Sequence, residues 1–275
     1  MHHKIRKTGR RNTSRKRSKK CRTRGSIYGY GNRNIIFCVA AVIVTVSVAF
    51  FVINIYYYIT GNDVTEDNRY PVKGVDVSSY QMDIDWQGLE DEGFKFAFIK
   101  ATEGSSHVDD SFEYNWDEAN DTDIRVGAYH FLSYETNGRK QAENFKKTVD
   151  KKWGMLPPAV DVELYGDYLE EPPEEQRLHK ILDEFLEAME DEYGMRPIIY
   201  TNTHVYEKYI SGHYDGYDIW ISAHDIPDNL TDGSEWTFCQ YTFHGISDSV
   251  ANGEKYVDLN VFNGSSWDLR NYDGK

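Results

Sequence analysis

The stretch PAVDVE, residues 158–163, is an almost continuous apolar run that ends in two carboxylates. Such a run is typical of a strand in a parallel sheet, because that strand is covered on both faces. Seven further runs are predicted to be strands: GVDVSS (74–79), KFAFIKA (95–101), RVGAYHF (125–131), PIIYT (197–201), DIWIS (218–222), WTFCQY (236–241) and KYVDL (255–259). The sequence therefore predicts eight short strands.

Helical patterns separate the first five strands. Residues 174–193 carry apolar side chains at helical spacing and are followed by Gly194, a common residue at helix ends. Residues 139–149 form a second such pattern, residues 203–210 suffice for two turns, and the last two connections are predicted to be loops. An α/β barrel is the expected fold. The alternative is an open doubly wound sheet, but no glycine-rich phosphate loop follows the first strand.

The N-terminal part of the chain has a different composition. Residues 1–33 hold 13 Lys or Arg and no acidic residue, whereas the chain beyond residue 61 holds 18 basic and 45 acidic residues, a net charge of −27. Between them lies the uncharged run IIFCVAAVIVTVSVAFFVI (35–53), followed by three tyrosines at 56–58. About 20 apolar residues span a bilayer as a helix, and Tyr collects at the interface.

We therefore expect four segments: a basic cytoplasmic arm (1–33), a single transmembrane signal anchor (34–59), a linker (60–71) and an outer domain (72–270). A cleaved signal peptide is the alternative, but its apolar region is shorter and small residues follow it, whereas bulky Phe50 and Phe51 stand here. The arm is explained as a topology signal that touches anionic lipid, so no nucleic-acid partner is expected.

The three cysteines support no disulfide framework. Cys21 lies in the arm, Cys38 in the apolar run and only Cys239 in the outer domain. Secreted animal domains of this size often carry disulfides, so their absence favours a bacterial surface. The expected location is the bacterial cell membrane, with one span and an extracytoplasmic domain.

Two carboxylates carry the chemical prediction. Asp161 and Glu163 lie two residues apart on one strand, so their side chains leave the same face. Like charges in an apolar run raise a pKa, and a protonated acid beside an ionised one is the equipment of glycoside cleavage. Alone, this motif favours a plainer interpretation, in which one carboxylate faces solvent or pairs with Lys100. Asp76 and Asp258 on the first and last strands predict a ring of carboxylates around the pair.

Seven stretches then occur in a characteristic order: GVDVSSYQ (74–81), FAFIKATEG (96–104), GAYHF (127–131), PAVDVE (158–163), IIYTN (198–202), DIWISA (218–223), and WTFCQY (236–241) with YVDLNVF (256–262). Over residues 72–265 the sequence resembles the glycoside hydrolase family 25 lysozymes, the Chalaropsis-type muramidases. The resemblance implies an irregular TIM-like (β/α)5(β)3 barrel. It also implies hydrolysis of the β-1,4 bond between N-acetylmuramic acid and N-acetylglucosamine in peptidoglycan, for cell-wall remodelling or catabolism.

The resemblance also implies roles for individual residues. Glu163 would be the general acid/base and Asp161 its partner, acting either as a nucleophile or by assisting the substrate acetamido group. Asp76 and Asp258 would line the groove, either in catalysis or in support of their neighbours. The implied substrate contacts are Tyr80, Lys100, Tyr129, Tyr200, Trp220 and Gln240. No metal or organic cofactor is implied.

Two other functions use the same features. One is a non-catalytic module that binds cell-wall glycan, and the other is a hydrolase of another N-acetyl sugar polymer such as chitin. The expected partners are peptidoglycan and, through the N-terminal helix, the membrane; the sequence gives no oligomeric state. His130 is expected to be a hydrogen-bonded inner residue, Trp86 and Trp116 are expected to pack in the core, and Cys239 has no catalytic context.

Overall fold

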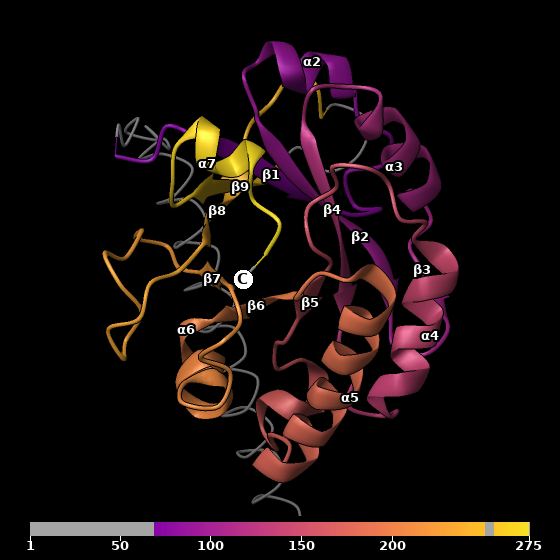
Figure 1. Ribbon diagram of the computed structural model, residues 1–275, viewed down its shortest axis with the longest axis vertical. Coiled ribbons are helices and arrows are strands. Elements are labelled where there is room, and N and C mark those ends of the chain that lie inside the picture. Colours follow the sequence, from indigo (N-terminus) through magenta and orange to yellow (C-terminus); the bar gives the residue numbers. More distant parts are fainter. Residues whose placement is uncertain (1–68, 251–255, 275) are drawn as a thin grey trace, which may run out of the picture. The chain divides into compact units, whose positions relative to one another are not determined.

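The computed structural model of the protein describes residues 69–250 and 256–274, whose strands form a closed sheet (Figure 1). The strands are β1 (Lys73–Val77), β2 (Phe96–Glu103), β3 (His107–Val108), β4 (Arg125–Phe131), β5 (Ala159–Asp161), β6 (Ile198–Asn202), β7 (Ile219–Ser222), β8 (Phe238–Gly245) and β9 (Val257–Phe262). The sheet closes because β1 pairs with both β2 and β9. Since β3 is only a short addition to β2, the barrel itself has eight strands.

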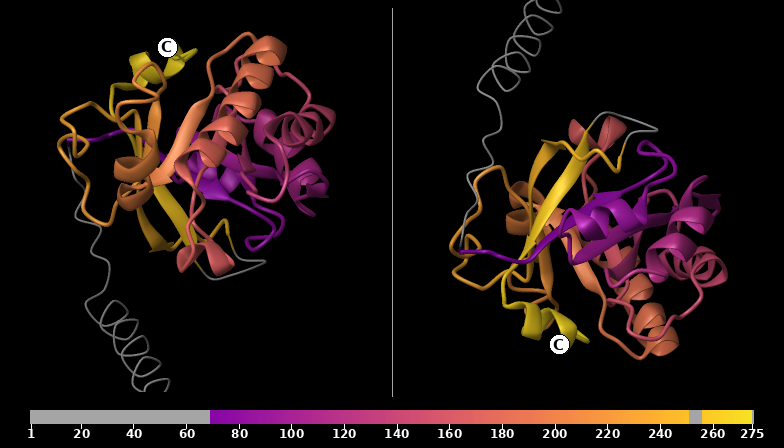
Figure 2. Two further views of the ribbon diagram at one scale, coloured as in Figure 1. Left: turned by 90° about the horizontal axis from the view of Figure 1, so that it is seen from below. Right: turned by 90° about the horizontal axis from the view of Figure 1, so that it is seen from above.

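Helices follow the first five strands of the barrel. They are α2 (Trp86–Asp91), α3 (Phe112–Asn120), α4 (Gly138–Thr148), α5 (Glu175–Tyr193) and α6 (Thr203–Val205), which continues as one π-helical turn, η2 (Tyr206–Ile210). A short 3₁₀ helix η1 (Gly166–Leu169) precedes α5, and α7 (Ser266–Arg270) follows β9. Between β7 and β9 the described residues form no helix. Figure 2 shows the consequence, since α3 to α5 cover one side of the barrel and loops lie beside β7 and β8.

The predicted (β/α)5(β)3 arrangement is therefore confirmed, and the open doubly wound sheet is wrong. Within the eight-stranded barrel, neighbouring strands are parallel except that β9 runs antiparallel to β8 and β1, and the short added strand β3 is antiparallel to β2. The predicted strand ends were less accurate: β5 covers 159–161 where 158–163 was expected, and β9 covers 257–262 where 255–259 was expected. The strand β3 was not expected.

Alternation along each strand divides the core in two. On β2, Phe96 and Phe98 point into the barrel, whereas Ala97 and Ile99 face the helices. The ring of Phe98 stacks on Trp220 of β7 at 4.4 Å between centroids, although β2 and β7 are not neighbours around the barrel. These rings can meet only across the barrel interior. Gly127 on β4 leaves the space for them, because a Cβ there would lie 2.6 Å from the Phe98 ring.

The N-terminal ends of the strands are closed by the C-terminal segment. The ring of Tyr272 packs against Phe238 and Phe262, and its hydroxyl donates to Asp218 Oδ2 at 2.8 Å. Arg125, at the start of β4, donates to the backbone carbonyls of residues 155, 269 and 272. This end of the barrel is thereby filled and covered, which leaves the opposite end for a site.

The predicted membrane anchor, the basic arm and most of the linker lie outside the described residues. Among residues 69–250 and 256–274, no helix is long and apolar enough to cross a bilayer.

Candidate active site

A cleft of about 480 Å³ opens at the C-terminal ends of the strands. All ten residues predicted for catalysis and substrate binding line it: Asp76, Tyr80, Lys100, Tyr129, Asp161, Glu163, Tyr200, Trp220, Gln240 and Asp258. Five further residues complete the lining: Val77, Ser78, Gln81, Phe131 and Phe243.

Strand periodicity explains how so many polar side chains meet. Residues two apart on a strand share a face, and on six strands the inward position changes from an apolar or small residue to a polar one. The pairs are Gly74 and Asp76, Phe98 and Lys100, Gly127 and Tyr129, Ala159 and Asp161, Ile198 and Tyr200, and Phe238 and Gln240. The cleft is thus the polar layer that lies directly above the aromatic core.

Asp161 and Glu163 form the most strongly perturbed pair of carboxylates. Burial, followed by the nearby charge of Glu163, raises the pKa of Asp161 well above its usual value, and Lys100 partly opposes the shift. Burial also raises the pKa of Glu163, and a hydrogen bond from Asn202 opposes that shift. Because both shifts are upward, the pair retains a proton at a pH where ordinary carboxyl groups are ionised. The predicted rise in pKa is confirmed in direction.

One oxygen of this pair lacks a partner within the part of the chain that the structure describes. Asp161 is only 7 % exposed, and its Oδ1 has no hydrogen-bond partner among the described residues. A buried carboxylate oxygen without a partner is costly, so such atoms in native proteins usually have a functional explanation. A bound substrate is the natural partner, because the residue lines the cleft.

Backbone hydrogen bonds fix the segment that carries the pair. The amide of Leu132 donates to the carbonyl of Asp161 at 2.9 Å, and the amide of Val162 donates to the carbonyl of residue 200 at 2.9 Å. The Tyr134 hydroxyl donates to the Glu163 carbonyl at 2.8 Å. Glu163 is therefore held firmly even though it lies beyond the end of β5.

Asp76 and Asp258 lie side by side for a different reason. They are direct partners in the antiparallel β1–β9 ladder. Asp76 Oδ2 accepts from Asn260 Nδ2 at 2.7 Å and from Gln240 Nε2 at 2.9 Å, and the same Gln240 nitrogen lies 3.3 Å from Asp258 Oδ2. Burial nevertheless raises the pKa of Asp76 to about 6. The predicted ring of carboxylates is thus present, with amide groups built into it.

The comparisons with known proteins agree with this geometry. Residues 75–250 match the family described as Glycosyl hydrolases family 25. The chain belongs to this family. A family 25 glycosyl hydrolase from Bacillus anthracis is 46 % identical, with a TM-score of 0.72 over 75 % of this chain and 95 % of that one. A bacterial lysozyme from Streptomyces coelicolor is 27 % identical, with a TM-score of 0.65 over 74 % and 96 %.

A curated relative gives the same picture. Lysozyme M1 of Streptomyces globisporus is 30 % identical over 216 residues, which are 71 % of this chain and 69 % of that protein. As a member of family 25, the chain is a glycoside hydrolase. The roles of individual residues in this enzyme remain predictions.

The aromatic residues of this family 25 site differ in accessibility. Tyr80 is 69 % exposed at the rim, and Phe243 is 54 % exposed. Trp220 is only 1 % exposed; its indole N–H donates to Asn260 Oδ1 at 2.7 Å. Tyr200 donates to Gln240 Oε1 at 2.7 Å. Tyr80 therefore presents an accessible ring at the rim of the cleft, whereas Trp220 is mainly part of the core.

Lys100 does not neutralise the central pair through an ion pair. Its ammonium lies 2.8 Å from Glu103 Oε2 and 5.0 Å from the centroid of the Phe131 ring. Its charge still lowers the pKa of Asp161. The plainer interpretation of the motif is that one carboxylate faces solvent or pairs with Lys100. The described contacts include no pairing of Lys100 with Asp161 or Glu163, and Asp161 is buried.

Two kinds of cleft residue escaped prediction. Ser78 and Gln81 lie in the turn after β1, where the Ser78 amide donates to Gln81 Oε1 at 3.0 Å. Phe243 was missed because the predicted strand stopped at residue 241, whereas β8 continues to Gly245 past a register shift after Gln240. Two-residue alternation from Phe238 and Gln240 would place residue 242 in the cleft, and the register shift brings Phe243 there instead, so the sequence pattern carried no signal for it.

The side chains assigned to the core are confirmed there. His130 is fully buried, with Nδ1 2.7 Å from Thr102 Oγ1 and Nε2 3.1 Å from Gln141 Oε1, and burial lowers its pKa to about 4. Trp86 and Trp116 are buried. Burial raises the pKa of Cys239 to about 12, so its thiol is unreactive at neutral pH.

Proposed function

We propose that this family 25 enzyme is a membrane-tethered lysozyme that cleaves the β-1,4 bond between N-acetylmuramic acid and N-acetylglucosamine in peptidoglycan. The observation that carries the chemistry is the pair Asp161 and Glu163 in the lining of the cleft, where burial raises the pKa of both carboxyl groups and favours a shared proton. Such a pair supplies both an acid for the leaving oxygen and a charge for an oxocarbenium-like transition state. The names of Lysozyme M1 and the S. coelicolor lysozyme support this reaction class.

Glu163 is the general acid in this proposal. It is less deeply buried than Asp161, so it is the member of the pair that a glycosidic oxygen can reach, and it delivers the proton that the pair shares. After the sugar leaves, the ionised Glu163 accepts a proton from the incoming water. Gln240 and Asn260 hold Asp76 in place through their amide donors.

Asp161 faces the anomeric centre by one of two routes. It attacks the anomeric carbon as a nucleophile, or its partnerless Oδ1 binds the acetamido N–H while the acetamido oxygen attacks. Substrates with an N-trifluoroacetyl group separate the routes, because that oxygen is a much weaker nucleophile. A large loss of rate indicates substrate assistance, and an unchanged rate indicates attack by Asp161.

Glu163→Gln tests the assignment of the acid. The variant should lose about 10²–10⁴-fold of the rate on purified peptidoglycan, because an amide cannot donate an acidic proton. Glu171→Gln, an exposed position outside the cleft, serves as the matched control and should retain full activity. Retention of more than about a tenth of the rate by Glu163→Gln, a far smaller loss than acid catalysis implies, contradicts the assignment.

Mass analysis of the digested products tests the bond that is cleaved. Reducing-end muramic acid is the expected product. Reducing-end glucosamine would show that the enzyme cleaves the other β-1,4 bond of peptidoglycan and would contradict a muramidase. Faster cleavage of chitin oligomers than of peptidoglycan would assign the enzyme to another N-acetyl sugar polymer. Tight binding of peptidoglycan without any product would instead indicate a glycan-binding module.

The tether rests on the uncharged run at residues 35–53 and the 13 basic residues before it. Full-length protein expressed in bacteria should stay in the membrane fraction after carbonate extraction. A chain that begins at residue 61 should be released. Release of the full-length chain, or its conversion to a shorter form cleaved near residue 60, would contradict an uncleaved anchor.

A further inference from the structure

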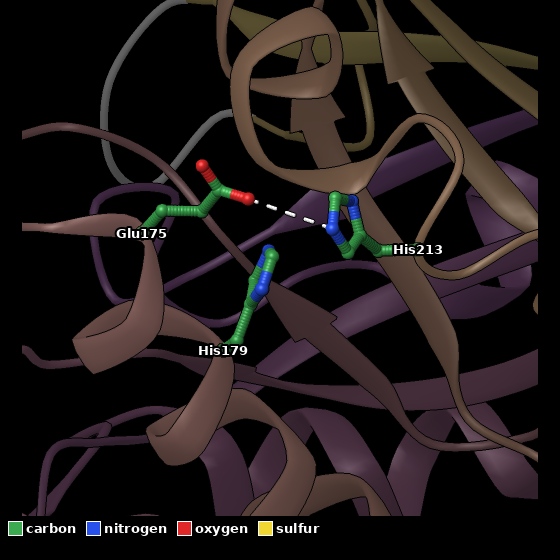
Figure 3. A group of neighbouring side chains, drawn as sticks. All are labelled: Glu175, His179 and His213. Carbon is green, nitrogen blue, oxygen red and sulfur yellow. Dashed lines mark ion pairs between the residues drawn. The ribbon is translucent and has the colours of Figure 1, made fainter.

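Three potential metal ligands meet on the surface of the barrel, outside the cleft. Glu175 and His179 lie one helical turn apart at the start of α5, and His213 lies in the loop that follows η2. Figure 3 shows their side chains turned toward one another from these two segments. One ligand atom from each residue lies within 4.8 Å of the other two. None of the three lines the cleft.

The distances suit a small divalent cation. Zinc binds imidazole nitrogen and carboxylate oxygen at about 2.0–2.2 Å, so two ligands of a tetrahedral ion lie about 3.3–3.5 Å apart. The Nε2 of His213 lies 3.5 Å from Glu175 Oε1. The His179 and His213 rings lie 4.5 Å apart between centroids at an interplanar angle of 47°. A shift of about an ångström in these side chains would complete a three-ligand site.

Backbone carbonyls orient both imidazoles. His179 Nε2 lies 2.7 Å from the carbonyl oxygen of Tyr209, in the π-helical turn η2, and His213 Nδ1 lies 3.3 Å from that of Ser211. For His213, this contact favours the tautomer that leaves the lone pair on Nε2, the nitrogen that faces Glu175. The structure thus presents that nitrogen in the form in which a metal binds it.

An ion pair alone explains only part of this arrangement. A protonated His213 pairs with Glu175, but His179 adds a second imidazole close to the same place, and a second potential cation there weakens an ion pair. Two imidazoles and one carboxylate are instead an established zinc ligand set, with the fourth position taken by water. The chemistry of the three groups therefore favours a metal ion.

We propose that Glu175, His179 and His213 bind one zinc ion, which ties the start of α5 to the loop before β7. The segment before α5 comes from β5, the strand that carries Asp161, and the loop after η2 leads to β7. A zinc ion at this point would join two elements that enter the barrel on either side of β6. The site would thus link the start of α5 to the loop after η2 and stabilise their packing.

The sequence resemblance implies no metal, and the local spacing of these residues does not predict a metal site. Glu175 and His179 are four residues apart, but the third ligand comes 34 residues later. Only the packing of the loop against α5, seen in the bond from the Tyr214 hydroxyl to Asp183 Oδ1 at 2.9 Å, brings it near.

Zinc binding to the metal-free, full-length protein in mild detergent tests the proposal. Titration calorimetry should detect one more high-affinity zinc ion in the wild-type protein than in His213→Gln or Glu175→Gln. The comparison with variants matters because His2, His3 and Cys21 in the N-terminal arm are further potential ligands. His204→Ala, at an exposed histidine outside the cluster, should bind zinc as the wild type does.

Thermal unfolding provides a second measurement. Zinc at about 100 times its dissociation constant should raise the melting temperature of the wild type by about 5–10 °C, and that of His213→Gln by much less. Both variants change exposed side chains, so they should fold normally without zinc. Equal zinc stoichiometry and equal thermal shifts in wild type and variants would overturn the proposal, as would a dissociation constant in the millimolar range. In that case the cluster is an ion pair with a neighbouring histidine.

Discussion

The two ends of the barrel interior are built from the same strands but carry different side chains, apolar at one end and charged at the other. At the N-terminal ends, rings such as Phe96, Phe98 and Phe238 fill the interior and make few polar contacts. At the C-terminal ends, one inward position further along, stand carboxylates that burial destabilises. The apolar end provides the stability that allows the polar end to hold buried charge. The residues that stabilise the barrel and the residues proposed for catalysis are therefore only two positions apart on each strand.

Asp161→Asn should lower the catalytic activity at the polar end without lowering the stability that the apolar end provides. We expect the rate on peptidoglycan to fall about 10²–10³-fold, because the variant cannot supply negative charge to the transition state. The free energy of unfolding at pH 7 should stay the same or rise, since a buried carboxyl with a raised pKa destabilises the folded protein at neutral pH. Urea unfolding measures the free energy of unfolding, and the rate at which soluble fragments form from peptidoglycan measures the activity. A parallel loss of activity and stability would contradict the separation.

Phe98→Ala, a change at the apolar end, should instead lower the stability of the protein. Removing a fully buried ring that stacks on Trp220 should lower the free energy of unfolding by about 3–5 kcal/mol. Phe243→Ala, the same change at the exposed rim of the cleft, should alter it by less than about 0.5 kcal/mol. Chemical denaturation measures both, and equal losses would show that the interior is not divided in this way.

The pH dependence of stability should reveal Asp76. Its pKa is raised to about 6 in the folded protein, so its stabilising contribution is complete below about pH 4 and is lost as the pH rises through 6. The stability of the wild type relative to Asp76→Asn should therefore fall by about 2 kcal/mol between pH 4 and pH 7. Denaturation of both proteins across this range measures the difference. A difference that stays constant with pH would contradict the raised pKa.

Gly127→Ala should have the smallest of these effects. The added methyl group would lie 2.6 Å from the Phe98 ring, so we expect a loss of about 1–3 kcal/mol. The double variant with Phe98→Leu should recover part of it, because the smaller side chain vacates that space. Gly216→Ala, where the nearest atom is the end of an arginine side chain at 3.4 Å, is the matched control. Melting temperatures of Gly127→Ala, the double variant and Gly216→Ala measure these effects. Strictly additive effects of Gly127→Ala and Phe98→Leu in the double variant would argue against a direct contact.

The sequence by itself determined the strand pattern and most of the site. Apolar runs and two-residue alternation report burial on each strand directly, so eight strands could be named without a structure. The positions of four carboxylates at strand ends, together with the resemblance to family 25, named the ten cleft residues. The spacing of Asp161 and Glu163 also fixed their common face, because that depends only on local geometry.

Tertiary structure decided whatever depends on distant segments meeting. Asp76 and Asp258 become neighbours only because β1 pairs antiparallel with β9. The Gln240 amide accepts from Tyr200 and donates to Asp76 only because the closed barrel brings both residues to it. The cluster of Glu175, His179 and His213 likewise exists only where a loop packs against α5. Periodicity records which face of an element is buried. It carries no information about which remote side chain lies opposite, and that is what sets the pKa values and the candidate zinc site.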